Sequence, residues 1–168
     1  MVRKALAFAL SLGFGFPLAA AADDVDLKFE GGIGVIPVSS GVGTAATATV
    51  VNRNIVRGVQ PPGQIWVISR LSARVKLDDS RISVDGRGLL LGGGNNIGLN
   101  ANQSVRATLI CGSATPTLHD TSLVPLEPNG DFRIDDLLTP SPPMPCDSPV
   151  LLIRNPAGSW FAGGILKR

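Results

Sequence analysis

The sequence predicts an all-β protein, an antiparallel β-sandwich or partly open barrel of about eight or nine strands. Short runs rich in β-branched and large apolar residues alternate with turn signals along the chain. The 20 Gly and 13 Pro residues are scattered over its length, and no apolar stretch keeps a helical spacing for long. Because no internal repeat and no linker interrupts this pattern, we expect residues 23–168 to form one domain.

Residues 1–22 have the pattern of a removable export signal. Arg3 and Lys4 supply the positive start, a short apolar run follows, and Pro17 precedes the small residues that end at Ala22. The apolar run is too short to cross a membrane. We therefore expect processing after Ala22 and an exported mature chain, periplasmic or extracellular, without a membrane span.

The formal charge of +2 changes when the leader is removed. Arg3 and Lys4 leave with it, so 13 basic residues face 13 acidic residues and the mature chain is neutral. A neutral chain lacks the basic footprint of nonspecific nucleic-acid binding. The charge is nevertheless uneven, because residues 53–106 hold eight basic and three acidic residues, whereas 108–153 hold six acidic residues and only Arg133.

The clearest strand is 66–77, in which apolar and charged residues alternate and predict one buried face and one solvent-exposed face. Its expected partner is 81–91, joined by a turn centred on Asp79-Ser80, because a slip of one residue would set the apolar side chains against the charged face. The resulting pairs are Leu77 with Ile82, Val75 with Val84, Lys76 with Ser83 and Arg74 with Asp85. We also expect a β-bulge at Asp85-Gly86 that brings Leu89 opposite Leu71.

Two later turns, 127–130 and 155–158, share the pattern x-Pro-x-Gly. They are expected to join 123–126 to 132–134 and 150–154 to 159–166. The expected pairs are Leu126 with Phe132, Val124 with Ile134, Ile153 with Phe161 and Arg154 with Trp160. Further strands are expected at 28–38, 47–59 and 104–111.

Two segments have the composition of loops. Residues 92–103 are rich in Gly and Asn, and 135–149 carry five prolines and so cannot form a central strand. The two cysteines, Cys111 and Cys146, lack the close spacing of a redox or zinc motif. In an oxidising compartment we expect them to form a disulfide that ties the proline-rich loop to strand 104–111; two buried free thiols are the alternative.

The sequence offers few residues for catalysis. It contains one histidine, His119, and no tyrosine, which excludes a zinc site made of several imidazoles. A hydrolase would have to use His119 with nearby carboxylates, and no Gly-x-Ser-x-Gly motif accompanies it. Calcium is a second alternative, since Glu127, Asn129 and Asp131, followed by Asp135 and Asp136, offer oxygen ligands, although without the glycine of the EF-hand loop.

The solvent-exposed face of strand 66–77 is the best candidate for ligand binding. Arg70, Arg74 and Lys76 project from it, with about 7 Å between alternate residues, and Arg57, Arg81 and Arg87 could lie nearby. Such a face could bind an anionic glycan, a lipid head group or an acidic protein surface; the alternative is a solvated face neutralised by carboxylates such as Asp85. Trp66 and Trp160 could form a carbohydrate platform, but with so few aromatic residues core packing is the simpler interpretation.

Two segments, Gly63-Gln64-Ile65-Trp66-Val67-Ile68-Ser69-Arg70-Leu71 and the run 81–91, resemble those of small secreted bacterial proteins of uncharacterised function. The resemblance extends from about Phe29 to Trp160-Phe161-Ala162. It implies a single exported domain and brings no activity, cofactor or binding residue with it.

Together these observations predict an exported, non-enzymatic binding or structural module that needs no cofactor. The two alternatives are a secreted hydrolase using His119 and a calcium-stabilised, adhesion-like domain.

Overall fold

The computed structural model describes residues 26–40 and 51–167. The expected leader, 1–22, and its processing point lie outside the described residues. Within them every regular element is a β-strand, which confirms the all-β prediction. The strands are β1 (Asp26–Gly34), β2 (Val38–Ser40), β3 (Val51–Arg53), β4 (Trp66–Val67), β5 (Arg70–Lys76), β6 (Arg81–Arg87), β7 (Leu90–Leu91), β8 (Ser104–Cys111), β9 (Thr117–Asp120), β10 (Val124–Pro125), β11 (Phe132–Leu137), β12 (Val150–Arg154) and β13 (Trp160–Lys167).

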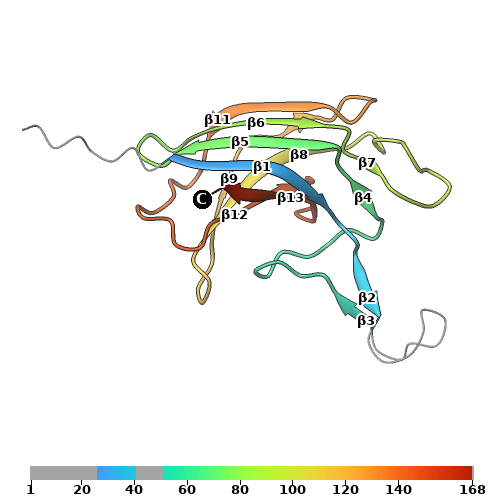
Figure 1. Cartoon of the computed structure of the whole chain (residues 1–168), viewed down its shortest axis with the longest axis horizontal. Helices are drawn as coiled ribbons and strands as arrows, with labels where there is room; N and C mark the ends of the chain where they lie inside the picture. The colour runs from blue at the N-terminus through green and yellow to red at the C-terminus, as the bar shows by residue number, and fades with distance from the viewer. Residues whose placement is uncertain (1–25, 41–50, 168) are drawn as a thin grey trace, which may run out of the picture.

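Nine of these strands form one antiparallel sheet in the order β10-β8-β12-β13-β1-β5-β6-β11, with β9 paired to β8. Strands β1, β5, β6 and β11 lie side by side along one layer (Figure 1). The sheet curls until its ends approach, so the architecture is a nearly closed, barrel-like form of the predicted antiparallel fold. The pairs β2-β3 and β4-β7 lie outside this sheet, and the β2-β3 pair projects away from it (Figure 1).

The turn 127–130 joins the two ends of the sheet and does not make the expected hairpin. Strand β10 pairs with β8, whereas β11 pairs with β6, so the predicted pairing of Leu126 with Phe132 and of Val124 with Ile134 is wrong. The turn itself forms, with Gly130 N donating to Glu127 O at 2.8 Å. Its role is to carry the chain across the seam between the first and last strands of the order.

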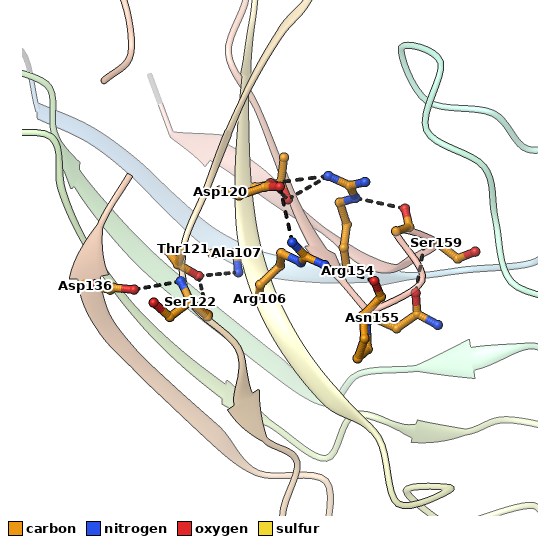
Figure 2. Close-up of polar contacts among 12 residues, drawn as sticks. Arg106, Ala107, Asp120, Thr121, Ser122, Asp136, Arg154, Asn155 and Ser159 are labelled. Atoms are coloured by element: carbon orange, nitrogen blue, oxygen red, sulfur yellow. Dashed lines mark hydrogen bonds and ion pairs between the residues drawn. The ribbon is translucent and has the colours of Figure 1, made fainter. Parts of the chain in front are cut away.

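Side-chain and backbone hydrogen bonds close this seam. Asp120 and Thr139 exchange two backbone hydrogen bonds of 2.9 Å each, and Ser122 N donates to Asp136 Oδ2 at 2.7 Å (Figure 2). The bonds at Asp136, which also accepts from Leu137 N, lower the pKa of its carboxyl group, with the Ser122 N–H as the largest cause. These contacts connect the end of β11 and the residue pair Asp120–Thr139 across the seam.

The central hairpin has the predicted faces but a register that differs by two residues. Arg81 lies opposite Lys76, and Val84 lies opposite Ala73. The reason is the connection, a four-residue loop over 77–80 in which Ser80 adopts a φ of 58°. Because side chains alternate with a period of two, this shift leaves the same residues buried.

The β-bulge expected at Asp85-Gly86 is not present, since the β5–β6 pairing is continuous and Leu71 faces Gly86. The same register continues into the short β4-β7 pair, where Trp66 lies opposite Leu91. A bulge occurs instead between β12 and β13. There Arg154 pairs with Trp160 as predicted, but Ile153 pairs with Ala162 and not with Phe161.

The core contains the inward side chains of all the main strands. Trp66 stacks on Phe161 with ring centroids 4.0 Å apart, and Trp160 is 4 % exposed and donates its indole N–H to Asn54 O. Both tryptophans are therefore core residues and not an exposed platform. Strand 104–111 is confirmed, and Cys111 and Cys146 form a disulfide with an S–S distance of 1.98 Å.

The remaining expectations concern the N-terminal part and the loops. The expected strand 28–38 corresponds to most of β1 and the start of β2, and of 47–59 only β3 is a strand within the described residues. Residues 92–103 contain no strand, and β11 extends to Leu137 before the proline-rich segment begins.

Candidate functional site

The outward side of β1, β5, β6 and β11 is a grid of charged residues, which we call the charged face. It arises from strict alternation, since Leu71, Ala73 and Val75 of β5 point into the core while the residues between them point outward. The same alternation applies to the other three strands. The charged residues of the face are Asp26, Lys28, Glu30, Arg70, Arg74, Lys76, Arg81, Asp85, Arg87, Arg133 and Asp135.

The register sets like charges directly opposite one another on this face. Lys28 of β1 faces Arg74 of β5 on one side and Lys167 of β13 on the other. Arg70 faces Arg87, and Lys76 faces Arg81. Directly opposed like charges destabilise a sheet, so the arrangement costs stability wherever no carboxylate compensates it.

Carboxylates compensate the cations of β6 and β11. Asp85 accepts from Arg87 Nε at 2.8 Å and from Arg133 at 3.0 Å, and these bonds, Arg87 first, lower the pKa of Asp85. Arg87 also pairs with Asp131 at 2.9 Å. The two carboxylates raise the pKa of Arg87, with Asp85 as the larger cause.

The cations of β1 and β5 make no ion pair of this kind, although Asp26 lies directly opposite Lys76. Among the described residues no carboxylate lies within 4.0 Å of Lys28, Arg70, Arg74 or Lys76. The expected opposition of Arg74 and Asp85 is wrong, because the two-residue shift places Ser83 opposite Arg74 and Ser72 opposite Asp85. Asp85 therefore neutralises Arg87 and Arg133 and not the cations of β5.

A hollow of about 430 Å³ opens in the middle of the charged face. Its polar lining combines two short hydroxyl side chains with longer charged ones: Ser72, Ser83, Lys28, Glu30, Arg74, Asp85, Arg133 and Asp135. The volume lies within the usual range for pockets that hold small ligands. Two of the cations without an ion pair, Lys28 and Arg74, thus line the concave surface, whereas Arg70 and Lys76 lie beside it.

Lys28, Ser72 and Ser83 were not among the residues singled out from the sequence. The alternation of Asp26, Lys28 and Glu30 with Leu27 and Phe29 is the signal that could have placed Lys28 on the charged face. Arg57, in contrast, lies away from this face and donates from Nη1 to Gly112 O.

His119 lies elsewhere and is buried, with 3 % of its surface exposed. Its Nδ1 lies 2.7 Å from Pro140 O and its Nε2 lies 2.9 Å from Thr117 Oγ1. Because a carbonyl oxygen can only accept, Nδ1 is the donor in the first contact. The Nδ1 bond thus ties β9 to the proline-rich segment, the Nε2 contact lies within β9, and the ring is buried.

The residues considered for calcium serve the turn 127–130 and its neighbours. Asn129 Oδ1 accepts from Asp131 N, and the Asp131 carboxylate accepts from Arg87 and from Gly88 N, which lowers its pKa. Glu127 contributes its backbone to the turn. Within residues 26–40 and 51–167, no group of three or more His, Cys, Asp or Glu residues is arranged to hold a metal ion.

A second polar cluster surrounds Asp120 on the other side of the barrel (Figure 2). Asp120 Oδ1 accepts from Thr108 Oγ1 at 2.6 Å and from Arg154 Nη1 at 3.3 Å, and Arg106 lies 3.5 Å from Oδ2. Arg154 Nε in turn donates to Gly158 O in the turn between β12 and β13. The cluster ties β8, β9 and β12 together, and its carboxylate is fully occupied by this network.

The chain matches no protein-family model, no curated protein and no solved structure. No helix in the described part of the chain is long and apolar enough to cross a membrane.

Proposed function

We propose that this protein is an exported, non-enzymatic binding module that holds an anionic ligand on the charged face. The observation that carries the proposal is the set of uncompensated cations, Lys28, Arg70, Arg74 and Lys76, around and beside the hollow. An anionic group in the hollow would supply the ion pair that Lys28 and Arg74 do not make with the carboxylates of the fold.

The cost of the arrangement supports a binding role. Proteins depart from stabilising local rules mainly at functional sites, and the opposed pair Lys28–Arg74 breaks the rule for cross-strand charges. Among the carboxylates of the face, Asp135 pairs with Arg81 at 3.2 Å and Asp85 pairs with two arginines. Asp26 lies opposite Lys76, and Glu30 makes only a 3.9 Å contact with Lys167. Neither of them forms an ion pair with Lys28 or Arg74, which leaves these two cations available to an external anion.

Export is supported by the leader pattern of residues 1–22 and by the disulfide, which is typical of oxidising compartments. In an exporting bacterial host, N-terminal sequencing of the protein recovered outside the cytoplasm should begin at Asp23. Recovery of chains that still begin at Met1 would contradict export.

The binding proposal is tested by chromatography on a sulfonate cation exchanger with a salt gradient. We expect the double variant Arg70→Gln, Arg74→Gln to elute earlier than the wild type, and the wild-type retention to fall with salt because screening shortens the reach of the charges. The matched control is Arg53→Gln, which makes the same change in net charge as the single variant Arg74→Gln but lies on β3, outside the charged face. Equal retention of Arg74→Gln and Arg53→Gln, or retention indifferent to salt, would leave only a solvated sheet face.

A further inference from the structure

We infer that the anionic ligand is an acidic polysaccharide, with its carboxylate or sulfate group between Lys28 and Arg74 and its hydroxyl groups over Ser72 and Ser83. This inference rests on the proposed function and narrows it to one class of ligand. It follows from three properties of the hollow: the position of its cations, the mixture of donors and acceptors, and the lack of apolar anchors around it.

The cations of the hollow lie on neighbouring strands. Lys28 and Arg74 are direct cross-strand partners on β1 and β5, with the strands about 4.8 Å apart. An acidic group between them would accept from the ammonium and the guanidinium at once, and such charge-assisted bonds are stronger than neutral ones. The bound anion would attract both cations and so offset the repulsion between them.

The rest of the lining suits sugar hydroxyl groups. A hydroxyl both donates and accepts, as do the side chains of Ser72 and Ser83, which lie diagonally adjacent on β5 and β6. Glu30 on the rim adds an acceptor, since its side chain is 68 % exposed and its contact with Lys167 is a long 3.9 Å. A polyphosphate could accept from the two serine hydroxyls, but when ionised it has no donor for their lone pairs or for Glu30.

An acidic protein surface fits the hollow less well. Protein interfaces are built around buried aromatic and aliphatic anchors, and the hollow has no exposed large apolar side chain among its lining residues. Within residues 26–40 and 51–167, the exposed large apolar side chains of the four strands are confined to Leu137, the last residue of β11, and Ile33, next to the last residue of β1. The charged face therefore offers no hydrophobic centre for a protein partner.

The inference is tested by isothermal titration of the purified disulfide-bonded protein with probes of defined chemistry. The acidic glycans are dextran sulfate and polygalacturonate, and the comparison probes are uncharged dextran, poly-L-glutamate and polyphosphate. We expect both acidic glycans to bind in a salt-dependent manner, dextran not to bind, and poly-L-glutamate and polyphosphate to bind at least tenfold more weakly at equal charge concentration.

A double variant separates the glycan class from simple charge. Ser72→Val with Ser83→Val removes both hydroxyl groups without changing any charge, and valine is well suited to strands. Loss of two hydrogen bonds should weaken binding of the acidic glycans about tenfold while leaving retention on the sulfonate resin unchanged. Ser141→Val in the proline-rich loop is the matched control, and Ser72→Ala with Ser83→Ala serves if the valine variant is poorly folded.

The outcomes distinguish the two proposals. Equal affinity for poly-L-glutamate or polyphosphate, or glycan affinity unaffected by both serine variants, would overturn the glycan class and leave the general anion-binding face intact. Resin retention that does not respond to Arg70→Gln, Arg74→Gln would overturn the proposed function itself.

Discussion

Replacing Arg74 with Gln should weaken ligand binding without weakening the fold. Glutamine removes the charge but keeps much of the side-chain stem that covers the sheet. If Arg74 is held for a ligand, the variant loses retention on the sulfonate resin and does not lose thermal stability. If Arg74 is a structural residue, stability falls with the charge.

The expected change in stability follows from the neighbours of Arg74. Directly opposite it lie Lys28 and the uncharged Ser83. Its next-nearest positions hold three carboxylates and two cations, which leaves one negative charge in excess: Asp26, Glu30 and Asp85 against Lys76 and Arg81. Lys28 is directly opposed and therefore nearer, so its repulsion is reduced but outweighs this excess, and one like-charge pair costs about 0.2–1 kcal/mol.

We therefore expect Arg74→Gln to raise the free energy of unfolding by a few tenths of a kcal/mol and at most by about 1 kcal/mol. For a domain of this size that corresponds to an increase in Tm of up to about 4 °C at low ionic strength. The gain should shrink in 0.5 M NaCl, where the charges are screened. Differential scanning calorimetry at the two salt concentrations measures both effects.

The control for this prediction is Arg87→Gln on the same face. Arg87 is bound to Asp85 and Asp131, so its loss leaves two carboxylates without their partner and should lower Tm. Lys28→Gln should raise Tm about as much as Arg74→Gln. The double variant should raise Tm by less than the sum of the two single changes, because either change alone removes the same repulsion. A fall in Tm for Arg74→Gln would refute the argument that this cation costs stability.

Three further predictions concern the fold. Gly86→Ala should lower the free energy of unfolding by about 1–3 kcal/mol, because a Cβ there would lie 2.1 Å from the Phe132 ring. This loss should be smaller in a Phe132→Leu background, and an equal loss would show that the ring is not its cause. The pKa of Asp136 is lower in the folded protein than its ordinary value near 3.8, so the charged carboxylate stabilises the fold above that value. This stabilisation is lost as the pH falls through the lower pKa of the folded state. The stability of Asp136→Asn should therefore depend less on pH in the acid range, and an unchanged dependence would contradict this cause. Replacing Cys111 and Cys146 with Ala should reduce the free energy of unfolding, measured by urea denaturation, by about 3–4 kcal/mol. Mass spectrometry that finds two free thiols in wild-type protein purified from the oxidising compartment would contradict the disulfide on which this prediction depends.

Local alternation predicted the faces of the sheet well. Strand β8 was delimited correctly, and the inward residues of β5 and β6 are those that alternate as apolar in the sequence. Burial alone determines which side of a strand is apolar, so period-two patterns are informative without knowledge of neighbours. The disulfide was also predictable without knowledge of the fold, because two cysteines allow only one pairing.

Register and strand order could not be read in the same way. The connection between β5 and β6 could have had two residues, as expected, or four, as observed in 77–80. Both lengths bury the same side chains of β5 and β6. Likewise, the turn 127–130 has the sequence of a tight hairpin, yet the strands it joins find partners in β8 and β6. These choices depend on the long-range pairing that nearly closes the barrel, which no local pattern reports.

The register is also what makes the charged face a candidate site. With the expected pairing, Asp85 would have opposed Arg74 and neutralised it; in the structure Asp85 is bound to Arg87 and Arg133. Other carboxylates are similarly engaged, Asp120 by two arginines and Asp136 by backbone N–H groups. If residues 1–22 are removed as expected, a chain with as many acidic as basic residues can therefore present cations without ion pairs, because several of its carboxylates are paired elsewhere in the fold. Net neutrality argues against nonspecific binding to polyanions over the whole surface, but it leaves room for an anion-binding site restricted to the hollow between β1 and β11.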